Sequence, residues 1–280
     1  MVLISQPCQP PEIRVLLADT PFVLAAAGLL RRSEGAYVGP FWHGLAPNFR
    51  RGVEAGQVEV RDLSESATVA CFLASCSGLS FMPVKAIVST DMAKQDPALV
   101  TEMVCPFTGE IYAAVRAVEA DFTIMHGYRA DRFGNVQWPL ARDADDIDQI
   151  IARGSRCLIV TVEEIVEHDE ITRQPNLTYI PAQWVEAVVE APFGAHPLAC
   201  DTIYNEDEDA LRAYVEAGST REGAGAYLDE YVRRAATHDD YLARSVVWRH
   251  SGAAFPSRGT QREGAVRDQR TAGVRGLGSN

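Results

Sequence analysis

Residues 57–77, QVEVRDLSESATVACFLASCS, show most clearly the local pattern from which the fold class is predicted. Gln57–Asp62 alternates polar and apolar residues, which is typical of a β-strand. Ser64 follows as a candidate helix N-cap, and apolar residues such as Val69 and Phe72 come after it. The segment therefore predicts a strand, a turn and a helix in direct succession.

The same succession is predicted elsewhere in the chain. Ile13–Asp19 is an apolar, β-branched run that leads into an Ala- and Leu-rich stretch ending at Arg32, which predicts a strand and then a helix. Further strands are predicted at Lys85–Thr90, Phe122–His126, Cys157–Val162 and Trp184–Glu190. Alternating strands and helices favour an α/β fold with a mainly parallel central sheet and flanking helices.

The carboxyl-terminal part has two different compositions. Asn205–Asp209 opens a helical region that extends to Arg244, in which two or three helices are predicted. Residues 251–280 contain six glycines, five arginines and one aromatic residue without an apolar period. Because such a segment buries too little apolar surface to offset its ordering entropy, we expect a disordered basic tail. Residues 1–250 are expected to form one main domain.

Charge and apolar content argue against two classes of partner. The 26 Lys and Arg residues and the 38 Asp and Glu residues give a formal net charge of −12, which repels nucleic acid. The longest apolar segment, Phe22–Leu30, is about half of what a bilayer span requires, and the amino terminus has no signal-peptide pattern. We therefore expect a cytoplasmic protein without a membrane partner, whose six scattered cysteines are reduced thiols.

The motifs of the common enzyme classes are absent from the sequence. It contains no G-x-x-x-x-G-K-[ST], no G-x-G-x-x-G after a strand, no G-x-S-x-G and no H-E-x-x-H. The six histidines form no i, i+4 pair or other compact ligand spacing, so no metal site is predicted. His126 ends a predicted strand and is interpreted as a structural or pH-sensitive residue rather than a catalytic base.

Glu65 is the candidate catalytic residue. A carboxylate at a strand end, partly desolvated and close to backbone donors, can act as a nucleophile toward an activated acyl group. Glu65 follows the strand ending at Asp62 and opens the next helix. The alternative is an ordinary first-turn glutamate that interacts with the helix dipole. On position alone, Glu102, Glu110 and Glu190 are comparable.

Six segments, in order, resemble the α subunit of family I coenzyme A transferases, of the glutaconate CoA-transferase type. The match covers most of the chain from Gly56 to about Ala243. The segments are LSFMPVKAIVSTD (Leu79–Asp91), CPFTGE (Cys105–Glu110), GYRADRFGNVQW (Gly127–Trp138), IVTVEEIV (Ile159–Val166), IPAQWVEAVVEAPFGAHPLAC (Ile180–Cys200) and YLDEYV near Tyr227.

The resemblance implies a fold, a reaction and a partner. The fold is of the CoA-transferase/NagB-RpiA-like type. Only MVLISQPCQPPE stands where the family has a strand, a glycine-rich loop and a helix, so we expect either a shortened amino-terminal part or a wrongly assigned start. A homologous β subunit completes an active site between the two chains. The substrates are an acyl-CoA thioester and a carboxylic acid, with no permanently bound cofactor. A glutamate attacks the thioester to give an acyl-glutamyl anhydride, and CoA then forms a glutamyl thioester.

The resemblance leaves three functions open. In glutaconate-type transferases the catalytic glutamate belongs to the β subunit. In a related ring-opening acyl-CoA hydrolase of steroid catabolism, the α subunit has an essential glutamate at the place that Glu65 occupies. A third hypothesis is a non-catalytic scaffold that only binds a partner.

Two loops are further candidates for the site. Phe107, Thr108 and Gly109 are interpreted either as a loop that lines the CoA or acyl pocket, with Gly109 allowing close backbone approach, or as a simple tight turn. Asp131–Asn135 (DRFGN) reads as a turn. Arg129, Asp131 and Asn135 are interpreted as a buried turn network or a subunit contact rather than as catalytic residues.

Overall fold

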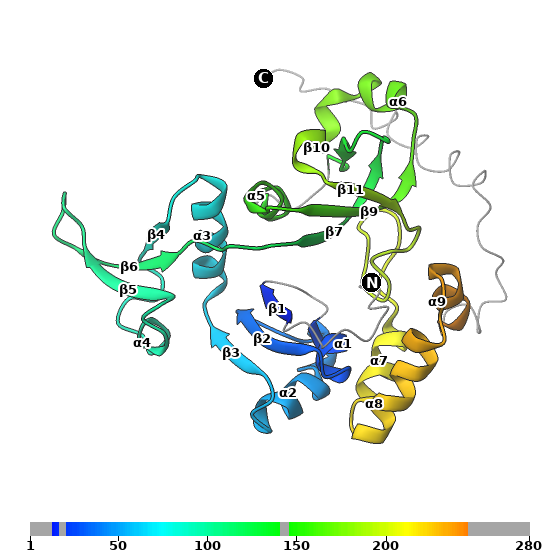
Figure 1. The fold of residues 1–280 in the computed structure, drawn as a ribbon, viewed down its shortest axis with the longest axis horizontal. Coiled ribbons are helices and arrows are strands. Elements are labelled where there is room, and N and C mark those ends of the chain that lie inside the picture. Colours follow the sequence, from blue (N-terminus) through cyan, green and yellow to red (C-terminus); the bar gives the residue numbers. More distant parts are fainter. Residues whose placement is uncertain (1–12, 17–20, 141–145, 246–280) are drawn as a thin grey trace, which may run out of the picture.

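The computed structural model describes residues 13–16, 21–140 and 146–245. The segment MVLISQPCQPPE and the tail at 251–280, on which the sequence made predictions, lie outside the described residues. The described chain contains three small sheets with helices packed around them (Figure 1).

The first sheet is parallel, with the order β1-β2-β3. It contains β1 (Ile13–Leu16), β2 (Leu30–Gly35) and β3 (Glu59–Asp62), with α1 (Pro21–Ala26) between the first two strands and the 3-10 turn η1 (Phe41–His43) and α2 (Pro47–Glu54) between the last two. The predicted helix up to Arg32 is therefore wrong beyond Ala26. Gly28 takes a φ of +70°, which ends the helical path, and β2 is then paired on both sides.

The strand, turn and helix predicted for residues 57–77 are confirmed. Helix α3 (Glu65–Cys76) follows β3 directly, and the Ser64 hydroxyl accepts a hydrogen bond of 3.3 Å from the Ala67 amide. Its buried face includes Ala67, Ala70 and Cys71, which pack in one core with residues of the second sheet.

The second sheet is antiparallel, with the order β4-β6-β5. It contains β4 (Phe81–Val84), β5 (Val100–Val104) and β6 (Ile111–Arg116), with the short helix α4 (Met92–Gln95) before β5. The strand predicted at residues 85–90 is wrong: these residues form turns, and Ser89 has a φ of +62°. The apolar character of that stretch reflects the burial of Ile87, which is 1% exposed, rather than strand pairing.

The third sheet is mixed, with the order β10-β8-β7-β9-β11. The strands β7 (Thr123–Ala130), β9 (Leu158–Ile165) and β11 (Ala187–Glu190) are parallel, whereas β8 (Val136–Gln137) and β10 (Thr178–Ile180) run antiparallel to their neighbours. Its other elements are α5 (Ile147–Gly154), α6 (His168–Arg173) and the 3-10 turns η2 (Pro175–Leu177) and η3 (Ala182–Trp184). Fully buried valines of β9 lie in its core.

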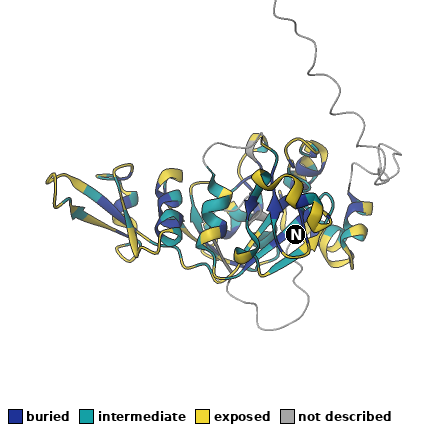
Figure 2. Cartoon of the chain, turned by 90° about the horizontal axis from the view of Figure 1, so that it is seen from above, coloured by how far each residue is buried: buried dark blue, intermediate teal, exposed yellow. Residues whose placement is uncertain are grey.

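Helices follow in the carboxyl-terminal region, as predicted. They are α7 (Glu208–Ala217), α8 (Arg221–Leu228), the π-helical turn η4 (Asp229–Arg233) and α9 (His238–Arg244). Figure 1 shows α7 and α8 beside the helices of the first sheet, and the antiparallel sheet projecting at the opposite end of the molecule. Figure 2 shows the same projecting sheet from above, with exposed residues along it.

The α/β fold class is confirmed, with one refinement. The parallel strands are divided between two sheets, and helix α3 with the antiparallel sheet lies between these two sheets in the chain order. None of the helices in the described part of the chain has the length and apolar character needed to cross a bilayer.

Candidate functional site

Glu65 lies at the carboxyl edge of the first sheet. It is the first residue of α3, three positions after the end of β3, and its side chain is exposed. Ligands of parallel sheets bind outside the carboxyl ends of the strands, and the first turn of a helix offers free amides to negative charge. Glu65 thus lies at the strand end and helix start expected from the sequence, but it is exposed rather than partly desolvated, and its catalytic role stays a prediction.

A charged network joins this edge to the second sheet. Arg61 of β3 lies 2.8 Å from Asp96, which precedes β5, and 3.2 Å from Glu34 on β2. Arg32 forms a 2.8 Å ion pair with Glu59, and this hydrogen bond lowers the pKa of the Glu59 carboxyl. A cavity of about 120 Å³ lies beside the network. Its lining comes from residues 59–63, from Met92, Gln95 and Asp96, and from residues 99–100.

Phe107, Thr108 and Gly109 form the tip of the hairpin between β5 and β6. The Gly109 amide donates to the Cys105 carbonyl at 2.9 Å. Gly109 has a φ of +71°, a conformation that favours glycine because glycine has no Cβ. The Phe107 side chain is 94% exposed. The structure thus contains the tight turn that the sequence allowed, and a role in a ligand pocket stays a prediction.

The structure does not bring Glu65 and the loop of Phe107, Thr108 and Gly109 together. The hairpin tip is at the outer end of the projecting sheet, whereas Glu65 opens α3 near the centre of the molecule (Figure 1).

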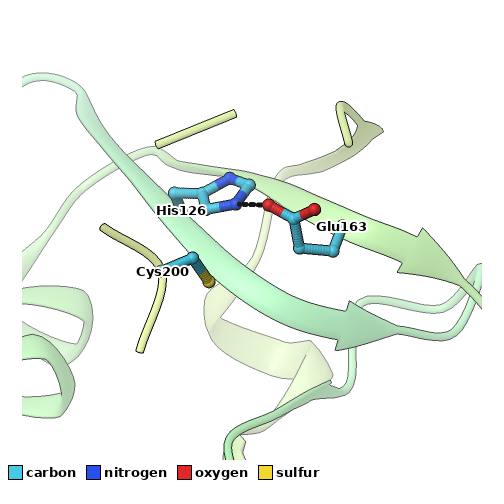
Figure 3. Close-up of side chains that lie close together, drawn as sticks. All are labelled: His126, Glu163 and Cys200. Carbon is cyan, nitrogen blue, oxygen red and sulfur yellow. Dashed lines mark hydrogen bonds and ion pairs between the residues drawn. The ribbon is translucent and has the colours of Figure 1, made fainter. Parts of the chain in front are cut away.

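The structure also contains a polar cluster that the sequence did not predict. His126 on β7 and Glu163 on β9 face one another, and Nε2 of His126 lies 2.7 Å from Oε1 of Glu163 (Figure 3). Oε1 also accepts a hydrogen bond of 2.8 Å from the Tyr204 hydroxyl. Cys200 lies beside this pair, and one ligand atom from each of His126, Glu163 and Cys200 lies within 4.8 Å of the others. We call these four residues the His126 cluster.

Residues 193–195 wrap around the His126 cluster. The Phe193 amide donates to Oε2 of Glu163 at 2.8 Å, and the Ala195 amide donates to the Tyr204 oxygen at 3.0 Å. Gly194 packs so closely on the imidazole that an added Cβ would lie 2.6 Å from a ring carbon of His126. The loop after β11 is therefore attached to the two central strands by the side chain of Glu163.

Burial and hydrogen bonding set the protonation of the cluster. Burial alone raises the pKa of Glu163, but the hydrogen bonds from His126, Phe193 and Tyr204 outweigh it, so the pKa lies below its usual value. Burial, followed by the charge of Glu163, raises the pKa of Tyr204. Burial likewise raises the pKa of Cys200 to about 12. At neutral pH Glu163 is therefore ionised, whereas the phenol and the thiol beside it are neutral.

Spacing along the chain does not predict this cluster, because its residues are far apart in the sequence. His126 and Glu163 are 37 residues apart, and the parallel register that pairs His126 with Thr161 places Glu163 next to the imidazole. A usable signal existed, since a charged residue interrupts the apolar run of a central strand at Glu163. His126 is held by hydrogen bonds on both nitrogens, in agreement with the structural interpretation of this residue.

The DRFGN turn forms the buried network that the sequence predicted. Asp131 is 0% exposed and accepts hydrogen bonds from the amides of Phe133 and Asn135, from the Asn135 side chain and from His168. Gly134 has a φ of +98° at this turn. These contacts give the turn a structural role.

Comparisons with known proteins agree on one family. The family model described as coenzyme A transferase matches residues 18–191, well over half of the chain. A protein of Archaeoglobus fulgidus is 37% identical over 225 residues, which are 79% of this chain and 48% of that protein. A subunit of the 3-oxoadipate CoA-transferase of Pseudomonas knackmussii is 31% identical, covering 79% of this chain and 78% of the relative. The chain thus spans about half the length of one of these relatives and most of the other.

Two further relatives bear on the function. A subunit of the glutaconate CoA-transferase of Acidaminococcus fermentans is 32% identical, covering 71% of this chain and 66% of the relative. The crystal structure of that transferase superposes with a TM-score of 0.75 and 28% identity over 80% of this chain and 74% of that chain. The cholesterol ring-cleaving hydrolase IpdA subunit of Rhodococcus jostii is 25% identical, covering 79% of this chain and 76% of the relative. By its sequence and by its fold, the chain belongs to the coenzyme A transferase family.

Proposed function

We propose that the chain is the α subunit of a heteromeric CoA transferase, which moves CoA from an acyl-CoA to a carboxylic acid through a glutamyl intermediate. The observation that carries the proposal is the identity of 31–32% to subunits of two CoA transferases, over 79% and 71% of the chain. The superposition with a glutaconate CoA-transferase supports it.

The proposed reaction uses one carboxylate twice. A glutamate oxygen attacks the thioester carbonyl, the C–S bond breaks, and CoA leaves as a thiolate, so that an acyl-glutamyl anhydride forms. The thiolate then attacks the glutamyl carbonyl, releasing the first carboxylic acid and leaving a glutamyl-CoA thioester. The acceptor carboxylate opens this thioester by the reverse steps. Both intermediates stay activated, so two moderate barriers replace one large one.

We propose Glu65 as the carboxylate of this chain that acts at the reacting acyl group. It is exposed at a carboxyl strand edge and at the beginning of a twelve-residue helix, where backbone amides stabilise negative charge. The competing placement of the nucleophile is on the β subunit. The two placements are separated by the response of exchange activity to Glu65→Gln.

The proposed partner is a homologous β subunit. The relatives above are named as subunits, which supports a second chain. The projecting hairpin presents Val104, Phe107 and Ile111 to solvent, with exposed fractions of 64%, 94% and 53%. Apolar side chains gathered at the end of a projection are typical of protein interfaces. We therefore propose that the hairpin tip contacts this second chain and, through it, borders the CoA or acyl pocket.

A second candidate function is a ring-opening acyl-CoA hydrolase. The identity of 25% over 232 residues to a cholesterol ring-cleaving hydrolase subunit favours it, together with the position of Glu65. Hydrolysis needs only water, whereas transfer needs a second carboxylate. In the cell, we place either reaction in the cytoplasm, where the five described cysteines, all free, stay reduced.

The test is reconstitution with a candidate β subunit from the same organism. The pair is assayed with acyl-CoA substrates in the presence and absence of acetate or succinate. Formation of a new acyl-CoA that requires the added carboxylate supports transfer, and release of acid or ring opening without it supports hydrolysis. If the pair forms but processes no thioester, the chain is a scaffold. If the isolated chain is active as a monomer, the heteromeric proposal is wrong.

A further inference from the structure

We propose that His126 Nε2, Glu163 Oε1 and Cys200 Sγ form a three-ligand site for a divalent transition-metal ion of the Zn²⁺ type. The inference is independent of the proposed transferase activity. It begins from the geometry of the His126 cluster, in which a nitrogen, an oxygen and a sulfur ligand from three separate segments lie within 4.8 Å of one another (Figure 3).

The hydrogen bonds behind His126 already suit metal ligation. The Thr161 hydroxyl lies 2.9 Å from Nδ1 and 3.3 Å from the Met125 carbonyl. In the metal-free chain, Nε2 carries the proton that it donates to the Glu163 carboxylate. In the metal-bound chain this proton is on Nδ1 instead, so the imidazole donates to Thr161, Thr161 donates to that carbonyl, and the Nε2 lone pair binds the ion. Such a hydrogen bond on the far nitrogen is the usual support of a ligating histidine.

Glu163 is likewise held for ligation. Its Oε2 is fixed by the Phe193 amide at 2.8 Å, and Oε1 faces both the imidazole and the Tyr204 hydroxyl. The carboxylate therefore keeps its orientation when the imidazole bond is replaced by a bond to a metal. Water remains for the fourth position.

Cys200 completes the ligand set and supplies the selectivity. The residue is 6% exposed and lies next to the carboxylate of Glu163, an environment that disfavours a free thiolate. A divalent cation reverses that balance: the S–H bond breaks, the sulfur binds the metal, and one proton is released to solvent. A set of one thiolate, one imidazole and one carboxylate suits Zn²⁺ and Co²⁺ better than Mg²⁺ or Ca²⁺.

Binding requires only a local adjustment. Tetrahedral bonds of about 2.0–2.3 Å place ligand atoms about 3.3–3.6 Å apart. The imidazole and the carboxylate must therefore separate from 2.7 Å, and the sulfur must move inward. Since Cys200 lies in the segment between β11 and α7, the ion would tie this segment to both β7 and β9.

The experiment uses the full-length chain, freed of metal by a chelator and titrated with Co²⁺. We expect one ion per chain, visible d–d bands of a four-coordinate site and a near-ultraviolet band from thiolate-to-cobalt charge transfer. Cys200→Ser removes the charge-transfer band and weakens binding at least tenfold. Cys157 is a second free cysteine and precedes β9, so Cys157→Ser is the matched control. It leaves the charge-transfer band and the affinity for Co²⁺ unchanged.

A second measurement keeps the proposal testable if Cys200→Ser folds poorly. X-ray absorption at the zinc edge of the Zn²⁺-loaded wild-type chain should show one sulfur neighbour and nitrogen or oxygen neighbours. The proposal is wrong if no stoichiometric ion binds, if the charge-transfer band survives in Cys200→Ser, or if the zinc spectrum contains no sulfur. None of these results depends on the transferase reaction, so this proposal and the proposed function fail separately.

Discussion

Nε2 of His126 lies 2.7 Å from Oε1 of Glu163, across two neighbouring parallel strands, with only 12% and 11% of the two side chains exposed. Glu163 also accepts hydrogen bonds from Tyr204 and from the backbone of Phe193. One carboxylate thus connects β7, β9 and the loop that follows β11.

Replacing this carboxylate should therefore destabilise the fold. In Glu163→Gln, the amide group presents a donor where three donors converge, so at least one buried hydrogen bond is lost. We expect the free energy of unfolding to fall by about 1–3 kcal/mol, measured by urea denaturation of the metal-free chain. Glu164→Gln, the exposed neighbour on the same strand, is the control and should change stability by less than about 0.5 kcal/mol. Equal effects of the two substitutions on the free energy of unfolding would contradict the structural role given to Glu163.

The buried Asp131 should make stability depend on acidic pH. Burial alone raises the pKa of its carboxyl, but hydrogen bonds from Asn135, His168 and the turn amides lower it below the usual value. A group with a lowered folded-state pKa stabilises the protein above its unfolded pKa of about 3.9, and the stabilisation is lost as the pH falls through the folded-state value.

Asp131→Asn should consequently be less stable than wild type at pH 7, by about 1–3 kcal/mol, and this difference should shrink as the pH falls from about 5 to about 3. Urea unfolding at a series of pH values measures it. The control is Asp121→Asn, whose side chain is 79% exposed. A difference for Asp131→Asn that does not change with pH would exclude the carboxylate as its origin.

Glu65→Gln should separate activity from stability. The side chain is exposed and opens a helix, so the substitution should change the free energy of unfolding by less than about 1 kcal/mol. In the reconstituted pair, loss of the nucleophile or base should lower the rate of acyl exchange by at least about 100-fold. The matched control is Glu208→Gln, because Glu208 is exposed and likewise opens a helix, α7. Full activity of Glu65→Gln would move the catalytic glutamate to the partner.

The hairpin tip should be needed for assembly but not for folding. Phe107 is 94% exposed, so Phe107→Ser should leave the melting temperature of the isolated chain unchanged. If the tip contacts the β subunit, the dissociation constant of the pair should rise at least tenfold, as for an aromatic interface residue. Calorimetric titration with the partner measures it. Phe122→Ser, at a 70% exposed phenylalanine before β7, serves as the control, and equal affinities of both variants would place the interface elsewhere.

Two glycines should respond to alanine in opposite directions. A Cβ at Gly127 would lie 2.9 Å from both Trp138 and Val136 in the core of the third sheet, so Gly127→Ala should destabilise the fold by about 1–3 kcal/mol. A Cβ at Gly225 in α8 meets nothing within 4 Å, so Gly225→Ala should stabilise the helix by about 0.5–1 kcal/mol. Thermal unfolding of the two variants gives the comparison, and shifts of the same sign would contradict the packing described.

Local chemistry made part of the fold predictable. The hydroxyl of Ser64 caps the helix that the sequence places there, and the DRFGN turn forms with its glycine at positive φ. Both depend on contacts within a few residues. The sequence does not predict the strand at Leu30–Gly35, because its Leu, Arg and Ser residues favour neither helix nor strand. The segment becomes a strand because it pairs with β1 on one side and β3 on the other. The strand predicted around Ile87 is wrong, because an apolar segment can be buried without pairing as a strand.

The amino-acid sequence predicts the α/β class, the helix that begins at Glu65 and, through six ordered segments, the family, whereas it left the turn at Gly109 as one of two interpretations. Which distant side chains meet follows from the three-dimensional arrangement alone. The register of β7 against β9 places Glu163 beside His126, and the return of the chain after β11 adds Tyr204 and Cys200. The physical reason is that caps and turns are formed by neighbours in the chain, whereas strand register is set by the packing of the whole core.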